Sequence, residues 1–137
     1  MINNKRFTDR FEILAYPYGY KYILFLVYIL HPIHIYTAYR NNYIKCCIFD
    51  ILLMLSSINY WRNPILKSNR RKIDIIIAVS NILYHSYISK NKTFLFGTLL
   101  YPINTFLYKY NYIYTSIICH CLLHISISTS AIFYYIK

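Results

Sequence analysis

The stretch LSSINYWRNPILKSNRRKIDIII, residues 55 to 77, gathers five basic residues and a tryptophan between two apolar runs. The second run then admits an aspartate, Asp74, near its start. Basic clusters between hydrophobic segments, with Trp and Tyr at the boundary, are typical of loops at lipid headgroups. The stretch therefore predicts two membrane-spanning helices joined by a basic loop over 61–72.

The composition of the whole chain agrees with a membrane protein. Of its 137 residues 58% are apolar and 14% are charged, and the mean hydropathy of +0.34 lies outside the usual range of soluble proteins. The 15 Lys and Arg outnumber the 4 Asp and Glu, but they sit at the ends of apolar segments and not on a water-exposed face that could bind phosphates. We therefore expect the lipid bilayer as the partner, with anionic headgroups at 61–72, and no nucleic acid.

The apolar segments predict an all-α fold, a polytopic transmembrane helical bundle in a single domain over 1–137. Each segment is close to the roughly 20 residues that cross a bilayer, and tyrosines flank the segments as an aromatic belt. The boundary near Tyr110 is the least marked, so the count is about five spans, with four possible. The four cysteines lack metal-site or redox spacing and are expected to be apolar core residues. The expected spans are 18–38, 44–60, 73–89, 93–109 and 111–135.

The distribution of basic residues predicts the orientation. With five spans, the N-terminal tail, the loop 61–72 and the turn near Lys109 share one side, which carries ten of the 15 Lys and Arg. By the positive-inside rule the N-terminus is then cytoplasmic. The first 22 residues are too polar for a cleavable signal peptide, so the first span is expected to act as the targeting signal. The sequon at Asn91 falls on the opposite side.

Polar residues recur at helical spacing within three of the expected spans. At 100° per residue such spacings keep them on one face, and polar groups in a membrane normally face the bundle interior. The residues are Asp50 and Ser57 in the second span, Asp74, Asn81 and His85 in the third, and Ser116, His120, His124 and Ser128 in the fifth.

Estimated depth suggests that four of these residues meet. A rise of 1.5 Å per residue puts His85, His120 and His124 about 18, 13 and 20 Å from the basic-loop side, and Asp50 about 20 Å from the other side. We therefore expect His85, His120, His124 and Asp50 as candidate zinc ligands, because zinc accepts imidazole and carboxylate in tetrahedral sites. His31, beside Pro32, could join them or replace one. Alternatively, these histidines only form hydrogen bonds that hold the helices together.

Asp74 lies near the start of its expected span. An acidic residue in the first turn of a helix interacts favourably with the helix dipole, and Arg70, Arg71 or Lys72 could pair with it. The simplest interpretation is a helix cap and anchor.

Ser56 to Tyr60, Asp74, and the HCLLH segment at His120 to His124 together resemble the alkaline ceramidase-like membrane hydrolase superfamily. That family combines a Ser-x-x-x-His segment, an Asp on the next span and a late His-x-x-x-His around a zinc-activated water. The resemblance implies that His120 and His124 bind zinc, that Ser56 is a supporting polar group and that Asp74 is a catalytic acid or base. Tyr60 stands at the family's first His, and five spans replace seven. The stretch 55–77 also resembles small polytopic membrane proteins of large DNA viruses and protists, and the Ile-, Asn- and Tyr-rich composition resembles translation of an AT-rich genome. A viral source would imply a host or virion membrane as the location.

Three functions remain open at this point. The first is a structural or accessory membrane component, and the second is a zinc-dependent intramembrane hydrolase of lipid amides or esters. The third is a small transporter or proton channel, expected to be a homo-oligomer because five short helices enclose little volume. A glycine-rich phosphate loop is excluded, since the chain has two glycines.

Overall fold

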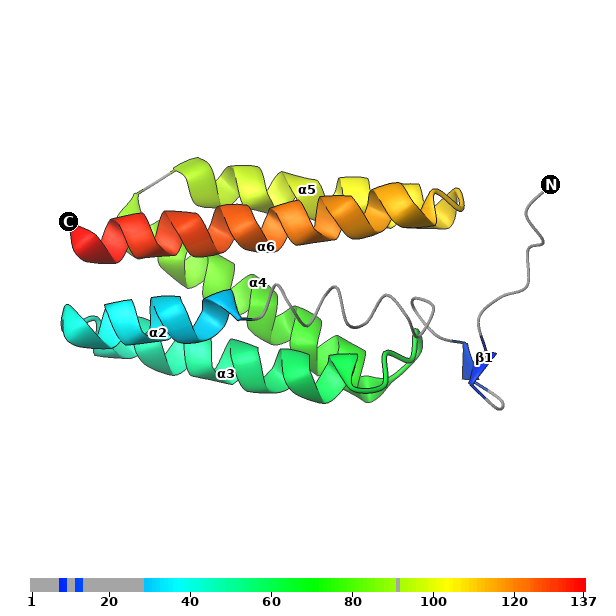
Figure 1. The fold of residues 1–137 in the computed structure, drawn as a ribbon, viewed down its shortest axis with the longest axis horizontal. Helices are drawn as coiled ribbons and strands as arrows, with labels where there is room; N and C mark the ends of the chain where they lie inside the picture. The colour runs from blue at the N-terminus through cyan, green and yellow to red at the C-terminus, as the bar shows by residue number, and fades with distance from the viewer. Residues whose placement is uncertain (1–7, 10–11, 14–28, 91) are drawn as a thin grey trace.

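The computed structural model describes residues 8–9, 12–13, 29–90 and 92–137, and these form an almost entirely helical protein (Figure 1). A short antiparallel hairpin of β1 (Thr8–Asp9) and β2 (Glu12–Ile13) precedes the helices. The first expected span falls outside the described residues over 18–28, as do Asn91 and most of the N-terminal tail. The described helices are α2 (Leu30–Arg40), α3 (Ile44–Trp61), α4 (Asn69–Ser89), α5 (Lys92–Lys109) and α6 (Ile113–Ile136).

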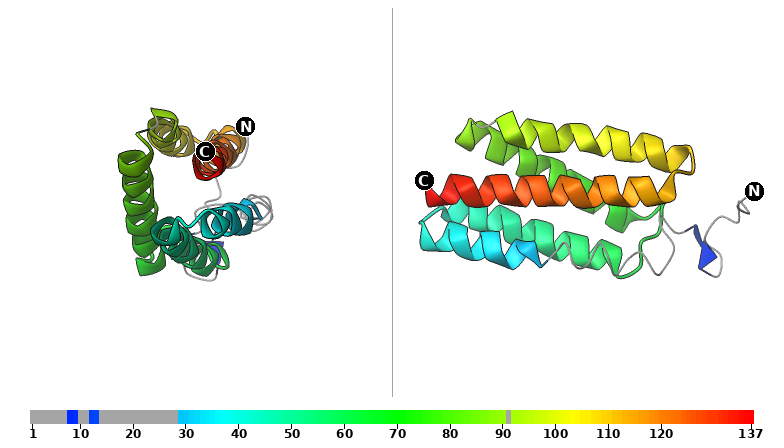
Figure 2. Two further views of the ribbon diagram at one scale, coloured as in Figure 1. Left: turned by 90° about the vertical axis from the view of Figure 1, so that its left-hand side faces the viewer. Right: turned by 45° about the horizontal axis from the view of Figure 1, so that its top comes forward.

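The five helices form a closed ring in chain order. Each helix packs against the next one along the chain, and α6 returns to pack against α2. Viewed along the bundle, α4 lies on one side, with α5 and α6 above the centre and α2 and α3 below it (Figure 2). We call the end of the ring with the 62–68 connection and the 110–112 turn the basic-loop end. The opposite end, with the 41–43 turn and Lys90, is called the far end.

Two of the connections are the same kind of tight turn. Asn42 after α2 and Asn111 after α5 have φ values of 63° and 64°. Asparagine tolerates this left-handed conformation better than most residues. In each turn two backbone N–H groups bond back to the last helical carbonyls, as from Tyr43 to Ala38 and from Tyr112 to Leu107. This Schellman pattern satisfies the helix end and reverses the chain, so that consecutive helices run antiparallel.

Helix α4 begins earlier than its polar sequence suggests. Ser68 has an extended backbone, and its Oγ accepts a hydrogen bond from the backbone N–H of Arg71 at 3.2 Å. Serine is a preferred N-cap, so α4 starts at Asn69 and not at 73. Asp74 therefore lies in the second turn, and the expectation that it caps this helix is wrong.

The helices carry many exposed apolar side chains, and several polar side chains are buried between them together with apolar ones. On α4, Ile76 and Leu83 are 63% and 62% exposed, whereas Asn81 and His85 are 2% and 1% exposed. The other described helices also carry large exposed apolar residues, such as Leu55 on α3 and Phe133 on α6. A soluble protein normally shows the reverse arrangement, and broad exposed apolar surfaces mark contact with lipid or another protein.

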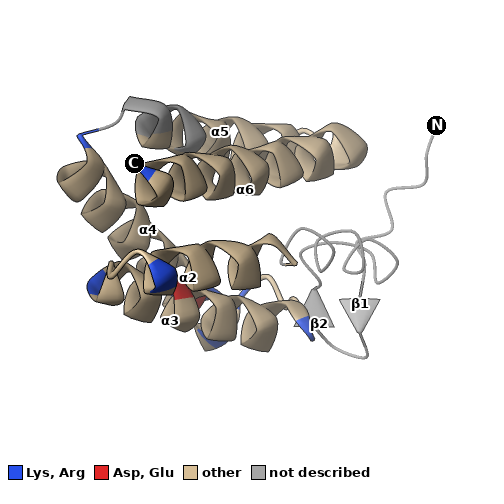
Figure 3. Cartoon of the chain, turned by 60° about the vertical axis from the view of Figure 1, so that its left-hand side comes forward, with Lys and Arg blue, Asp and Glu red and all other residues tan. Residues whose placement is uncertain are grey.

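By length and composition, two of the described helices could cross a membrane: α3 and α6. α4 contains the polar run Asn69 to Lys72, and α5 combines lysines at both ends with Pro102 and Asn104, which lowers their mean hydropathy. Described Lys and Arg residues lie at or near the helix ends (Figure 3). The described part of the chain is thus all-α, with two helices suited to a bilayer.

Candidate functional site: a cavity inside the helix ring

A cavity of about 230 Å³ lies inside the ring, and residues of all five described helices line it. The chain has five histidines and four acidic residues. All five histidines line this cavity, together with Asp50 and Asp74. The groups that could exchange protons are therefore concentrated at one interior site.

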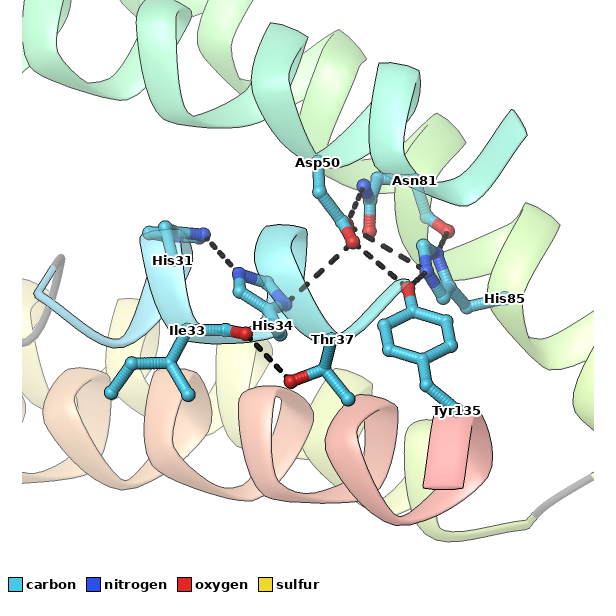
Figure 4. Close-up of polar contacts among 8 residues, drawn as sticks. All are labelled: His31, Ile33, His34, Thr37, Asp50, Asn81, His85 and Tyr135. Atoms are coloured by element: carbon cyan, nitrogen blue, oxygen red, sulfur yellow. Dashed lines mark hydrogen bonds and ion pairs between the residues drawn. The ribbon is translucent and has the colours of Figure 1, made fainter. Parts of the chain in front are cut away.

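Asp50 on α3 is the centre of the most connected polar group (Figure 4). Its side chain is 1% exposed. Oδ1 accepts a hydrogen bond from Asn81 Nδ2 at 2.9 Å, and Oδ2 accepts one from the Tyr135 hydroxyl at 2.8 Å. His85 Nε2 lies 3.6 Å from Oδ1, and His34 Nδ1 lies 3.7 Å from Oδ2. Helices α2, α4 and α6 thus each supply a polar partner to one buried carboxyl.

The hydrogen bonds around His85 fix where its protons can be. Nδ1 lies 2.9 Å from the backbone carbonyl of Asn81, and because a carbonyl only accepts, Nδ1 carries a proton. Nε2 forms a short hydrogen bond with the Tyr135 hydroxyl, which also bonds to Asp50. Tyr135 therefore bridges the imidazole and the carboxyl.

This bridge accommodates two proton arrangements. In the first, Nε2–H of His85 donates to the Tyr135 oxygen, and the Tyr135 O–H donates to an ionised Asp50. In the second, Tyr135 donates to a neutral His85, and a protonated Asp50 donates to the Tyr135 oxygen. One proton passes from His85 to the tyrosine oxygen while the tyrosine proton passes to Asp50. Every hydrogen bond is kept in both states, so the group can move a proton without moving heavy atoms.

The other four histidines continue from Asp50 along the bundle as a row that we call the histidine row. His34 Nε2 lies 2.8 Å from His31 Nδ1, both on α2. The His31 ring then meets the His124 ring edge-on, with centroids 6.0 Å apart. His124 Nε2 lies 3.2 Å from His120 Nε2 on α6. The row thus passes through His34, His31, His124 and His120.

The row ends near the basic-loop end of the ring. The His120 ring lies edge-on to Trp61, the last residue of α3, with centroids 5.4 Å apart. Its Nδ1 lies 3.1 Å from the Asn104 side chain, which accepts a hydrogen bond from Ser116 at 2.5 Å. Fifteen residues of α6 separate His120 from Tyr135, a rise of about 22 Å. This length is a large part of the roughly 30 Å thickness of a bilayer's hydrocarbon core.

The four expected zinc ligands do not meet at one point in the structure. Asp50 lies with His85, and His120 lies with His124, but His31 and His34 stand between the two pairs. The estimate failed because it measured depth from helix ends without knowing the stagger of the helices. In the described part of the chain, no three His, Cys, Asp or Glu side chains are arranged to hold a metal ion. His120 and His124, which the sequence resemblance assigns to zinc, do lie together, with their Nε2 atoms 3.2 Å apart, and their binding of zinc stays a prediction.

Asp74 and Ser56, the predicted catalytic residues, do lie together. Oδ1 of Asp74 accepts hydrogen bonds from the Ser56 and Ser57 hydroxyls at 2.9 and 2.7 Å. The suggested pairing of Asp74 with Arg70, Arg71 or Lys72 is not formed. Within the described residues, the close contacts between a carboxylate and a cationic side chain or histidine involve Asp50 and not Asp74.

Three members of the site were not singled out from the sequence: His34, Tyr135 and Asn104. His34 is three residues from His31, a spacing that places both on one helical face. Tyr135 was not distinguished in the sequence from the tyrosines expected at the membrane surface. In the structure its side chain is buried, with 1% of it exposed. Asn104 follows Pro102 in a segment without polar periodicity, so only the packing of α5 on α6 identifies it.

The cavity combines a buried carboxyl in a hydrogen-bonded network, a histidine row and a second carboxyl near the loop. Comparison with protein-family models, with curated proteins and with solved structures finds no match to this chain.

Proposed function

We propose that the chain is a multi-pass integral membrane protein that conducts protons through its ring of five helices. In this proposal each described helix contributes to a span, and the basic-loop end faces the cytoplasm together with the N-terminus. The outward apolar side chains and the inward polar ones support membrane embedding. The excess of Lys and Arg in the segments assigned to the cytoplasm supports the orientation.

The observation that carries the proton-conducting role is the lining of the cavity. All five histidines and both carboxyls of the helices face one interior space, and the chain places no histidine anywhere else. Ionisable residues at membrane depth are costly, and their usual roles include proton relays. A structural seam needs neither titratable groups nor a cavity, since serine and asparagine supply the same helix-to-helix hydrogen bonds.

The size of the cavity fits a hydrated proton path. At roughly 30 Å³ per water molecule, a cavity of about 230 Å³ has room for about seven waters. Water held among imidazole and carboxyl groups would connect those that do not touch directly. Because residues of one chain line this cavity, the proposed path does not require a homo-oligomer.

Proton flux into liposomes tests the proposal. Purified protein is reconstituted into vesicles that contain K⁺ and a pH-sensitive dye, and valinomycin then sets a membrane potential that draws protons through the protein. We expect acidification or alkalinisation well above that of protein-free vesicles. Asp50→Asn keeps the shape of the site but removes a proton carrier, so the flux should fall at least about tenfold.

The matched control lies outside the cavity. Thr129 on α6 is exposed, and its hydroxyl bonds only to the carbonyl of Ile125 in its own helix. Thr129→Val should keep the wild-type flux. A folded wild-type protein, with normal helix content and a single species in detergent, that conducts no protons in either direction would overturn the proposal. The role would then be that of a structural or accessory membrane component.

A further inference from the structure

Asp74 is a second carboxyl on the cavity wall, and it lies apart from the group around Asp50. It belongs to the second turn of α4, directly after the basic loop. Its hydroxyl partners Ser56 and Ser57 lie in the last turns of α3, before Trp61. Both hydrogen bonds end on Oδ1, so Oδ2 is the oxygen that remains to take a proton.

The surroundings of Asp74 suit exchange with water. Hydroxyl groups stabilise a carboxylate without neutralising it, whereas a close Lys or Arg would hold it ionised. Arg71 lines the same cavity, but its Nη1 donates to the backbone carbonyl of Leu66 at 3.1 Å. The guanidinium is thereby held on the loop. The carboxyl is therefore free to change protonation state.

We infer that Asp74 is the group that takes up or releases protons at the basic-loop end of the cavity, an inference that rests on the proposed proton conduction. Oδ2 of Asp74 accepts a proton from water on the loop side. It then gives that proton to cavity water, which passes it to His120, the nearer end of the histidine row. Asp74 returns to the carboxylate, held by Ser56 and Ser57, and His120 gains the N–H bond that carries the proton onward.

Other titratable groups share the cavity with Asp74 and set its electrostatic environment. Among the described residues that line the cavity, Arg71 is the one Lys or Arg, so a proton entering there meets one fixed positive charge. Further titratable groups come from α4 and from the helices that pack against it: Asp50 and Tyr60 on α3, His85 on α4, Tyr101 and Tyr108 on α5, and His120 and His124 on α6. His31 and His34 on α2 also line the cavity.

One-sided pH titration of the flux tests the inference. Oriented vesicles are titrated on the loop side while the pH on the far side is held constant. Asp74→Asn keeps an oxygen for Ser56 and Ser57 but cannot carry a proton. We expect its flux to fall at least about tenfold and to lose its dependence on loop-side pH, and we expect Asp74→Glu to restore both. Titration from the far side should show the wild-type pH dependence in both variants.

A second variant separates proton transfer from a structural role. Ser57→Ala removes a donor to the carboxylate, which favours the protonated carboxyl. The midpoint of the flux should then move to higher loop-side pH. If wild-type protein conducts but Asp74→Asn has the same flux and the same titration, the inference is wrong and Asp74 is a helix-packing contact. If the wild-type protein does not conduct, the proposed function itself fails, so the two failures are distinguishable.

Discussion

Asp50 and Asp74 line one cavity, but their partners differ in kind and number. Asp50 has close contacts with Asn81, Tyr135 and two histidines, which come from three helices. Asp74 is held by two serines of one helix. Asp50 is therefore built into a hydrogen-bonded network that can pass a proton onward. Among the described residues, the hydrogen-bond partners of Asp74 are serine hydroxyls, which in the proposed path suits a group that exchanges protons with water. Under the proposed function, the difference would place the two carboxyls at different steps of one path.

The largest expected effect is the loss of the Asp50 side chain. Asp50→Ala leaves the buried Asn81 amide without its acceptor, which costs about 1–3 kcal/mol. It also removes one of the two hydrogen-bond partners of the Tyr135 hydroxyl and opens space beside His85. We expect the free energy of unfolding to fall by about 3 kcal/mol, measured by denaturation of purified protein in detergent. Asp74→Ala should cost about 1 kcal/mol, because Ser56 also donates to the carbonyl of Leu53. Equal costs for the two variants would remove the structural basis of the comparison.

The sequence predicts the helices better than it predicts their inward groups. Apolar runs and Tyr-rich boundaries locate α3, α5 and α6, because the periodicity of a helix is local. Which side chains meet depends on stagger and rotation between helices, which no local pattern encodes. His120 and His124 could be paired from their spacing of four. The link from His31 to His124 requires the contact of α2 with α6, and the bridge by Tyr135 requires that α6 reach the level of Asp50.

The second prediction concerns Tyr135. Its hydroxyl links Asp50 to His85, so that Asp50 belongs to a network and is not an isolated hydrogen-bond acceptor. Tyr135→Phe keeps the ring but removes the hydroxyl between Asp50 and His85. We expect proton flux to fall by about 100-fold, since a positioned proton-transfer group contributes roughly 10² to 10⁴. The free energy of unfolding should fall by only about 1 kcal/mol, the usual net value of one hydrogen bond. The neighbouring Tyr134→Phe is the matched control, because the Tyr134 hydroxyl bonds to the Ile88 carbonyl and not to the network. Similar flux in both variants would argue against the bridge.

A smaller effect is expected where Ser56 and Ser57 hold Asp74. Ser57→Ala removes the shorter of the two hydrogen bonds to the carboxyl, and Ser57 is 1% exposed. We expect a loss of about 1 kcal/mol in the free energy of unfolding, with a moderate change in flux. Ser56→Ala should cost less, because Ser56 divides its hydrogen bonding between Asp74 and Leu53. Thermal denaturation of the two variants under identical detergent conditions measures the order, and the reverse order would mean that Ser56 is the main support.

The smallest effect on conduction is expected from substitutions outside the cavity. Cysteines placed there also test whether the two ends of the ring face opposite sides of the membrane. Lys67 in the basic loop and Lys137 at the C-terminus are both exposed. Each can be replaced by cysteine without touching the histidine row, so Lys67→Cys and Lys137→Cys should conduct like wild type. A membrane-impermeant thiol reagent should label them from opposite sides of sealed vesicles. Wild-type protein controls for Cys46, Cys47 and Cys119, which are buried, and for the half-buried Cys121. Labelling of both cysteines from one side would mean that the two ends of the ring do not face opposite sides of the membrane. Asp74 could then not exchange protons with one side while Asp50 lies further toward the other.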